Sequence, residues 1–391
     1  MKTVNLDGVA TAGPVREVSE VMLPWLWERH ANPASPHREG AAAADALEEA
    51  RAHVAGLVGA EPESVVFTSG ATEANNLAIK GAARMAYLKG RSILAIPVHE
   101  HPSLLHPSRA LDRAPRWELV PIPVNRTGLV HTSSLPDGPL ALLGMAHAHA
   151  ELGALQPAAE LVQAARERGG IALVDATLTA GRIPLDMDSL GRPDLLSLSF
   201  HHMGGPMGVG ALIVEQGLAL PPLLEGGAQE RGYRPGTPNL AGCVGAGVAA
   251  RLGRERVEAR ARVLSELGSL LMKGLLDAQG VHLTGPDLDS RLPGHVSVRV
   301  EGINGQALVM AMGERGILVA TASPCADEAG LPSASLLAAG YSREEAGSAV
   351  LFCVPPTSEI GITDIQRVTR CFREEVQRLR VLAGRMATPH R

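Results

Sequence analysis

The composition of this 391-residue chain excludes several classes of protein. Hydrophobic residues make up 45% of it, yet no apolar run reaches the ~18 residues that a membrane span requires. The net charge of -5 and the small set of aromatic residues offer neither an electrostatic nor a stacking surface for nucleic acid. The four cysteines have no CxxC spacing, so neither a disulfide framework nor a zinc site is expected. The N-terminal segment lacks the apolar stretch of a signal peptide, which favours a cytoplasmic location.

Alternating helical and strand patterns begin near residue 40 and predict an α/β fold. A helical stripe of Leu47, Ala50, Val54 and Leu57 is followed by short apolar runs, which predict strands at 64–68, 93–98, 140–146, 171–174, 195–199 and 209–214. Strands that are apolar on both faces are typical of a mostly parallel sheet covered by helices. Ligands of such sheets bind in the loops beyond the carboxyl ends of the strands.

After residue 245 the pattern changes to that of a smaller α+β unit. It predicts a long helix at 254–278, strands at 295–300 and 317–320, and a last helix at 363–381. We therefore expect a large domain at 16–255 and a small domain formed by 1–15 and 256–391.

The segment 67–76 reads Phe-Thr-Ser-Gly-Ala-Thr-Glu-Ala-Asn-Asn and follows a predicted strand. A strand that turns through Gly70 into a helix points free backbone N–H groups at an anion, which makes Ala71 and Thr72 candidate phosphate-binding residues. The same residues also suit an ordinary helix start with Thr72 near the cap. The segment alone leaves both interpretations open.

Further loop motifs follow in a characteristic order and spacing: Asn32-Pro33-Ala34-Ser35, Glu100-His101, Val174-Asp175-Ala176, Ser199-Phe200-His201, Gly204-Gly205-Pro206, and 226–231 with Arg234-Pro235-Gly236-Thr237. Together with 67–76 they resemble the class V aminotransferases, and most closely the cysteine desulfurase and selenocysteine lyase branch. The resemblance extends from residue 5 to about residue 357. It implies an aspartate aminotransferase-like fold (pyridoxal-phosphate fold type I), pyridoxal phosphate as cofactor, and usually a homodimer.

The resemblance also assigns roles to individual residues. It implies three phosphate ligands on this chain and a fourth that reaches across from the other subunit: Thr72, Ser199, His201 and Thr237. His101 is expected to stack on the pyridine ring, and Asp175 to pair with the ring nitrogen and keep it protonated. The alternatives are an ordinary loop histidine for His101 and a helix-capping carboxylate for Asp175.

One position departs from the family in a way that changes the chemistry. The family's strand ends Ser-x-His-Lys, and the lysine amine forms a Schiff base with the cofactor aldehyde, whereas this chain has His202 at that position. Imidazole has no primary amine, so His202 cannot form that bond, although it can move protons near neutral pH. The lysines are residues 2, 80, 89 and 273. Pyridoxal phosphate or pyridoxamine phosphate is therefore expected to be noncovalent if it binds.

Positions on the substrate side differ from the family as well. The family's Asn-Asn-Glu-Ile-Gly is replaced by His149-Ala150-Glu151-Leu152-Gly153, and its glutamine three residues after the aspartate is Leu178. The arginine that holds the substrate carboxylate falls on Val350 in this comparison. These changes predict impaired desulfurase turnover.

Cys325 follows Thr321-Ala322-Ser323-Pro324, at the position where the family has the cysteine that receives sulfur as a persulfide. A thiolate there could carry sulfur or ligate iron. The alternative is a partly buried cysteine that acts as a small apolar residue. Cys325 joins His202 and His101 as a candidate catalytic residue.

Three functions stay open from the sequence. The first is a cysteine desulfurase in the context of sulfur and iron–sulfur metabolism. The second is an enzyme that holds its cofactor noncovalently and uses His202 as base. The third is a pseudoenzyme that pairs with an active paralogue through Thr237, or serves a sulfur acceptor or iron–sulfur scaffold protein. A homodimer or mixed dimer is expected in each case, with no metal, nucleic acid or membrane partner.

Overall fold

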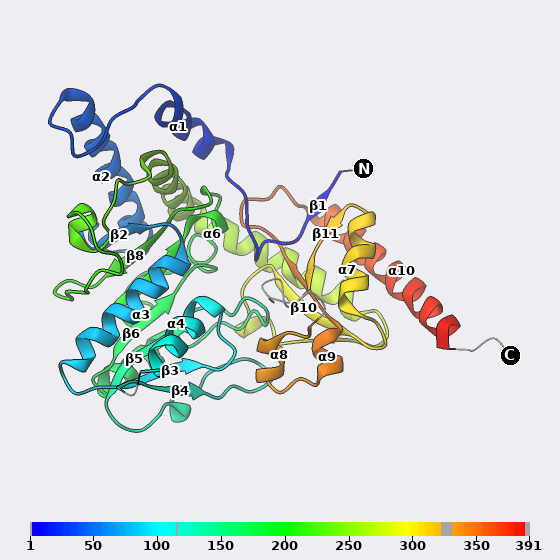
Figure 1. Cartoon of the computed structure of the whole chain (residues 1–391). Coiled ribbons are helices and arrows are strands. Elements are labelled where there is room, and N and C mark those ends of the chain that lie inside the picture. The colour runs from blue at the N-terminus through cyan, green and yellow to red at the C-terminus, as the bar shows by residue number, and fades with distance from the viewer. Residues whose placement is uncertain (1, 115, 322–330, 388–391) are drawn as a thin grey trace.

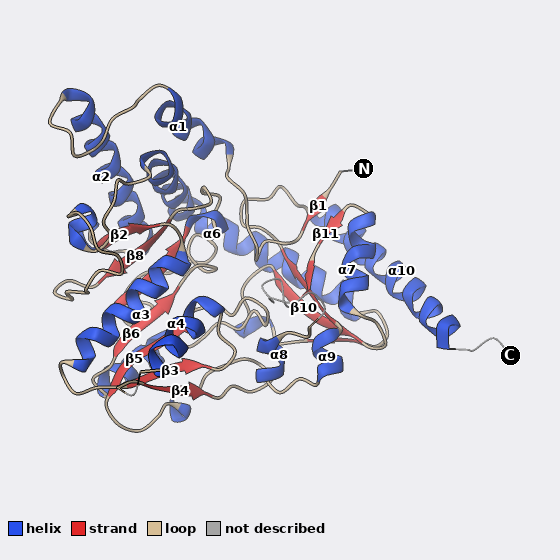
Figure 2. Cartoon of the chain, in the orientation of Figure 1, coloured by secondary structure: helices blue, strands red, loops and turns tan. Residues whose placement is uncertain are grey.

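The computed structural model describes residues 2–114, 116–321 and 331–387. Its larger lobe is built on a seven-stranded sheet in the order β2-β8-β7-β6-β5-β3-β4 (Figures 1 and 2). The strands are β2 Val65–Thr68, β3 Ile93–Pro97, β4 Glu118–Ile122, β5 Leu140–Ala146, β6 Ile171–Asp175, β7 Leu195–Ser199 and β8 Gly210–Val214. Strand β8 is antiparallel to both its neighbours and the other pairs are parallel. This confirms the predicted α/β fold with a mostly parallel sheet.

The sheet is buried on both faces because its strands are apolar at successive positions. Leu195 packs in the core beneath α3 Ala71–Tyr87 and α4 Pro102–Asp112, whereas Leu196 packs in the core on the opposite face. That second core is closed by α2 Arg38–Val58, α5 Ala158–Glu167 and the first half of α6 Leu240–Leu276. Because helices cover both faces of the sheet, a ligand can reach it only at its edges and at the loops beyond the strand ends.

The smaller lobe contains an antiparallel sheet in the order β12-β13-β10-β9. Its strands are β9 Val281–Leu283, β10 His295–Val300, β12 Ala320–Thr321 and β13 Ala349–Cys353, and the helices near it are α7 Gly305–Glu314, α8 Ala334–Ala338, α9 Arg343–Gly347 and α10 Ile362–Ala387. The predicted strand 317–320 is divided, because β11 Ile317–Leu318 pairs with β1 Val4–Asn5 and β12 pairs with β13.

Helix α6 begins at Leu240, well before the predicted start at residue 254. The added turns are rich in glycine, which weakens the helical signal in the sequence. Packing explains these glycines: a Cβ on Gly247 would lie 2.6 Å from Cα of Ala50 in α2. The helix runs without a break through residues 255 and 256, where the domain boundary was placed, and extends between the two lobes (Figure 1).

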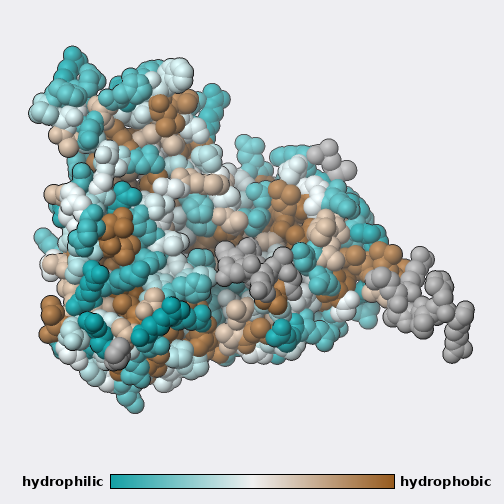
Figure 3. Space-filling view, viewed as in Figure 1, coloured by the Kyte–Doolittle hydropathy of each residue, from teal (hydrophilic) through white to brown (hydrophobic). Residues whose placement is uncertain are grey.

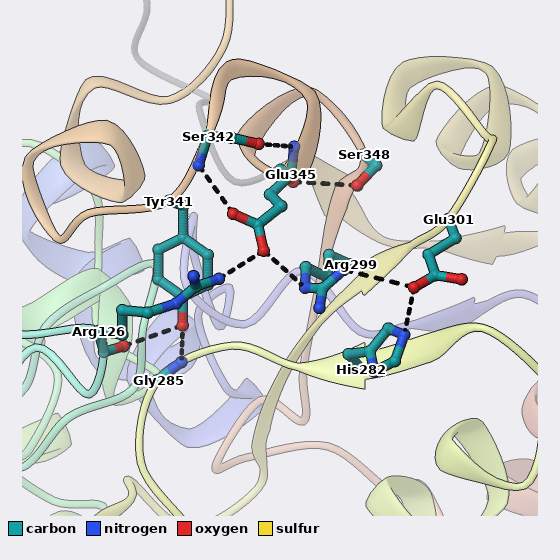
Figure 4. Close-up of polar contacts among 9 residues, drawn as sticks. All are labelled: Arg126, His282, Gly285, Arg299, Glu301, Tyr341, Ser342, Glu345 and Ser348. Atoms are coloured by element: carbon teal, nitrogen blue, oxygen red, sulfur yellow. Dashed lines mark hydrogen bonds and ion pairs between the residues drawn. The ribbon is translucent and has the colours of Figure 1, made fainter.

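A polar network joins the lobes on one side of the molecule (Figure 4). The Arg126 guanidinium of the larger lobe pairs with Glu345 of α9 and lies 4.3 Å from the ring centroid of Tyr341. Tyr341 donates its hydroxyl to the carbonyl of Arg126 at 2.9 Å, and accepts from the backbone N–H of Gly285 at 3.0 Å. The network therefore holds α9 against the larger lobe.

Among the described residues, no helix combines the length and the hydropathy that a bilayer crossing requires.

Candidate active site

The sheet brings the predicted site residues to one edge. Most of them lie at or directly after the carboxyl ends of β2, β3, β6 and β7: Ala71, Thr72, His101, Asp175, Ser199, His201 and His202. Asp175 pairs in register with Ser197 of β7, and Thr68 and Ser199 both pair with Gly210 of β8. Because the parallel strands end at the same edge, residues that are distant in the sequence share one site.

The start of α3 has the geometry of an anion-binding helix N-terminus. Gly70 precedes the helix with φ 150°, no side chain caps the helix, and nothing lies within 4 Å of where a Cβ on Gly70 would be. The N–H groups of the first helical turn lack intrahelical acceptors. The Nδ1 atom of His201 is buried and has no partner among the described residues. Free donors around open space fit a phosphate group.

Asp175 is buried and its carboxylate is held from two sides. Oδ2 accepts from Nδ2 of Asn75 at 2.8 Å, and Oδ1 accepts from the backbone N–H of Thr177 at 2.9 Å. The Asn75 amide is itself oriented, because its Oδ1 accepts from the hydroxyl of Ser197 at 2.6 Å. An oriented carboxylate at this position fits the N–H of a protonated pyridine ring. Asn75 and Ser197 were not among the residues predicted from the sequence.

His101 begins α4 and is tied into the same network. Its Nδ1 accepts from the backbone N–H of Ser103 at 3.1 Å and lies 2.9 Å from the Ser103 hydroxyl. That hydroxyl accepts from Nδ2 of Asn75 at 2.9 Å, so it donates to Nδ1 of His101. The neutral imidazole therefore carries its proton on Nε2. The stacking role of His101 stays a prediction.

Glu100, directly before His101, is a buried acid to which the sequence analysis gave no role of its own. Its Oε1 accepts from the backbone N–H of Ala146 at 2.8 Å. Burial raises the pKa of Glu100 to about 8, and the nearby Asp175 carboxylate adds to the rise. Glu100 is thus mostly protonated at neutral pH.

His202 lies in the turn Phe200–His202 that follows β7. Its ring centroid is 3.9 Å from that of His201. Burial holds the pKa of His202 well below its usual range, and the neighbouring His201 and Arg182 lower it further. His202 is therefore a neutral imidazole at pH 7, able to accept a proton and unable to form a Schiff base.

Lys80 lies in α3 and Lys273 in α6, whereas Lys2 and Lys89 lie outside the helices and strands. Lys80 lines a groove of about 340 Å³ between α3 and α4, which also reaches Thr72 and His101. Lys2, Lys89 and Lys273 are exposed. The site thus fits a phosphate and a pyridine ring, and the turn after β7 carries the imidazole of His202.

The substrate side of the site is apolar. Leu178, Ala148, Leu351 and Cys353 belong to one buried cluster where the two lobes meet. The predicted counterpart of the carboxylate-binding arginine, Val350, packs instead in the core of the smaller lobe. Side chains alternate along β13, so Leu351 is the residue that faces the larger lobe. Neither the Val350 nor the Leu351 side chain can bind a carboxylate.

His149 is held by contacts with its own loop and with His99. Its ring stacks on His99 with 4.2 Å between centroids. Its Nε2 donates to the carbonyl of His99 at 2.7 Å, and its Nδ1 accepts from the backbone N–H of Leu152 at 3.1 Å. Both ring nitrogens are therefore engaged in holding the loop.

The described part of the site does not include two of the predicted residues, Thr237 and Cys325. Thr237 is exposed on the loop before α6, where its role toward a second subunit stays a prediction. Cys325 lies outside the described residues. Cys243, Cys353 and Cys371 are buried. No group of three or more metal-binding side chains occurs within 2–114, 116–321 and 331–387.

The chain belongs to the class V aminotransferase family, whose model matches residues 4–342. Members of this family depend on pyridoxal phosphate. Among its relatives, the chain is 36% identical over 355 residues to the cysteine desulfurase IscS of Dictyoglomus turgidum, covering 90% of this chain and 89% of that one. It is also 36% identical over 384 residues to the cysteine desulfurase IscS of Methanosarcina thermophila, covering 97% and 93%. These matches confirm the predicted family and branch.

A solved structure described as a NifS-like protein superposes with a TM-score of 0.88 at 29% identity, covering 96% of this chain and 100% of that one. This similarity confirms the predicted aspartate aminotransferase-like fold.

Proposed function

We propose that this chain is a cysteine desulfurase-like protein that binds pyridoxal phosphate or pyridoxamine phosphate noncovalently and lacks ordinary desulfurase turnover. The observation that carries the proposal is His202, which follows β7 where the family has its lysine. A ring nitrogen cannot replace a primary amine in capturing an aldehyde. The free donors at Ala71 and Thr72 and the oriented Asp175 support retention of the cofactor.

Different residues of the chain would bind different parts of the cofactor. The first turn of α3, with Ser199 and His201, would hold the phosphate, while Asp175 would pair with the ring nitrogen. When bound, the cofactor supplies a ring that accepts electrons from the substrate. The Asn75 and Thr177 contacts keep the carboxylate of Asp175 pointed in one direction.

The decisive experiment restores the amine. His202→Lys should acquire pyridoxal phosphate that survives denaturation after borohydride reduction, whereas the wild type should release its cofactor. His202→Arg is the matched control, since it adds a cation at the same position without a primary amine, and it should release its cofactor as the wild type does. The proposal is wrong if the wild type holds pyridoxal phosphate covalently or converts cysteine to alanine with steady turnover. Failure of every variant to bind cofactor would overturn the binding half of the proposal.

A second candidate function is an enzyme in which His202 acts as base toward a substrate held with pyridoxamine phosphate. The Nδ1 atom of His202 favours it, because this atom is buried and has no hydrogen-bond partner among the described residues, although the lowered pKa makes the ring a weak base. Absorbance titration with pyridoxamine phosphate tests it in wild type and His202→Gln. Absence of any binding to the wild type would remove this candidate.

We also propose that the chain works as a dimer, either with itself or with an active paralogue. The loop that carries Thr237 is held rigidly by two ion pairs: Arg51 binds both oxygens of Glu230 at 2.8 and 2.9 Å, and Arg234 binds Glu73 at 3.0 Å. Helix α1 Arg16–Trp27 exposes Leu23, Leu26 and Trp27, and apolar atoms gather near it in Figure 3. Such a patch is typical of a protein contact surface.

The partner proposal is tested by sedimentation and by pull-down from native extract. A dimer that dissociates on Leu26→Glu with Trp27→Glu supports it, and a wild-type monomer at all concentrations contradicts it. Recovery of a desulfurase, a sulfur acceptor or an iron–sulfur scaffold protein would identify the mixed assembly.

A further inference from the structure

The groove between α3 and α4 is a cavity to which the proposed function gives no ligand. Its volume is about 340 Å³, and the two helices that line it lie side by side over the same face of the sheet (Figure 1). Thr72 and His101, at the starts of the helices, form the end nearest the candidate cofactor site, whereas Lys80 and Ala110 lie farther along. The groove therefore begins beside the cofactor site and continues away from it.

The α3 side of the groove is polar. Thr72, Asn76 and Lys80 recur at every fourth residue, so their side chains lie in one row that spans roughly 12 Å of the helix. The Asn76 amide donates to the carbonyl of Thr72 at 3.0 Å, which orients the amide and leaves its second N–H for a ligand. The row thus presents a hydroxyl, an amide and an ammonium group in succession.

Lys80 gives the groove its positive charge. No carboxylate in the described part of the chain forms an ion pair with its ammonium group. The described residues that line the groove include no Asp or Glu, and His106 adds an imidazole from α4. Lys80 is half-buried, so water screens its charge less than that of a fully exposed lysine. An unpaired cation in a groove without acids favours an anionic ligand.

The α4 side of the groove is largely apolar. Pro102, Pro107 and Ala110 line it, together with the imidazoles of His101 and His106. An inorganic ion bound to α3 would leave this wall uncovered. Pockets of a few hundred Å³ with an apolar wall and a few polar groups are typical of sites for small organic molecules. The wall therefore adds an organic body to the requirement for a negative charge.

We infer that the groove between α3 and α4 binds a small organic phosphate, with the phosphate on Lys80 and Asn76 and the organic body against the wall formed by α4. A lysine ammonium binds phosphate as a point charge, and a neighbouring amide can donate to the remaining oxygens. A carboxylate is better matched by the fork of an arginine, and no arginine is among the described residues that line the groove. The ligand lies beside the cofactor site, so the inference goes beyond the proposed function.

Calorimetric titration of the full chain with phenyl phosphate tests the inference. It is carried out with the chain saturated with pyridoxal phosphate, which fills the cofactor site, and again without cofactor. Phenol serves as the probe without a phosphate, and inorganic phosphate as the probe without an organic body. The wild type should bind phenyl phosphate saturably and more tightly than either. Lys80→Gln should weaken this binding by about tenfold or more, because a charged hydrogen bond to the phosphate is lost.

A second variant and a matched control locate the ligand. Ala110→Phe fills the groove but keeps Lys80, and it should also weaken binding of phenyl phosphate by tenfold or more. Lys89→Gln removes an exposed lysine that does not line the groove, and it should bind phenyl phosphate as the wild type does. If neither groove variant folds, the ring signals of His106 in the wild type decide by nuclear magnetic resonance, since they must shift on addition of phenyl phosphate.

Three results would overturn the inference. The first is a wild type that does not bind phenyl phosphate or whose His106 signals do not respond to it. The second is a Lys80→Gln or Ala110→Phe variant that retains the wild-type affinity. The third is equal affinity for inorganic phosphate, which would show a site for the ion alone.

The outcome is separable from that of the proposed function. A chain that binds phenyl phosphate through Lys80 but does not bind pyridoxal phosphate keeps the groove assignment and overturns cofactor binding. A chain that binds pyridoxal phosphate, but whose binding of phenyl phosphate does not depend on Lys80, does the reverse.

Discussion

The side-chain amide of Asn75 donates to the carboxylate of Asp175 across 2.8 Å, although 100 positions separate them in the chain. The same Nδ2 also donates to the hydroxyl of Ser103, and Oδ1 accepts from Ser197. One buried amide therefore sets the direction of Asp175 and, through Ser103, the tautomer of His101. It links the two side chains expected to contact the cofactor ring.

Replacing Asn75 tests this link. Asn75→Leu keeps a similar side-chain volume but removes a hydrogen-bond partner from Asp175, Ser103 and Ser197. Each group left unsatisfied should lower the free energy of unfolding by about 1–3 kcal/mol. Urea unfolding should show the loss, and absorbance titration should show weaker binding of pyridoxal phosphate. Asn76→Ala is the control, since the Asn76 amide donates a hydrogen bond to the backbone carbonyl of Thr72 and has no other side-chain hydrogen bond among the described residues. Equal effects of the two variants would contradict the role of Asn75.

Glu100 should make stability depend on pH in a defined direction. Its pKa is about 8 in the folded chain and near 4.5 in the unfolded chain, so the folded state binds the proton more tightly. The resulting stability is fully present below about pH 4.5 and is lost as pH rises through 8. Glu100→Gln mimics the protonated acid, so the urea concentration at the unfolding midpoint should change less between pH 5 and pH 8 than it does in the wild type.

Glu345→Gln is the control for that measurement. Hydrogen bonds from the Ser342 backbone and from Arg126 lower the pKa of Glu345, so its contribution is lost only below the range studied. In Glu345→Gln, the change of the urea midpoint with pH between pH 5 and 8 should match that of the wild type. A Glu100→Gln variant with an unchanged slope would show that Glu100 ionises normally.

Removing one partner of the buried ion pair between Arg51 and Glu230 should lower the stability of the fold. Arg51→Met leaves the Glu230 carboxylate buried without its cation, which is expected to cost about 3–5 kcal/mol of unfolding free energy. Adding Glu230→Gln should recover part of that loss, because no buried charge remains. Glu48→Gln removes an exposed partner of Arg51 and should cost less than about 1 kcal/mol. Additive losses in the double variant would contradict this account.

The contact of Arg126 with Glu345 and Tyr341 should couple the lobes only weakly. Arg126 is about half exposed, so a double-mutant cycle with Arg126→Ala and Glu345→Ala should yield a coupling of about 0.5–1 kcal/mol in urea unfolding. The exposed pair of Arg192 and Asp188, which lies within one turn of the larger lobe, provides the comparison and should couple less. A coupling of zero would mean that the network in Figure 4 does not hold α9 in place.

Local sequence pattern anticipated the elements whose signal is contained in a few residues. The apolar runs at 140–146, 195–199 and 295–300 became β5, β7 and β10 with the predicted bounds. The prediction failed where tertiary contacts decide. The glycine-rich start of α6 is helical because it packs against α2, and 317–320 is divided because its halves pair with different strands. Strand β13 is an apolar run that the sequence analysis did not assign, and its uniform apolarity does not show that Leu351 rather than Val350 faces the junction of the lobes.

The sequence by itself determined the family motifs, their order, and the histidine at position 202, since covalent chemistry is settled by residue identity. Only the tertiary structure decided the protonation of Glu100 and His202, the contact of Asn75 with Asp175, and the burial of Arg182 between the two lobes. Those properties depend on burial and on partners from distant segments, which residue identity does not specify. Packing sets the local dielectric and the available donors, and through them the charge that each group carries.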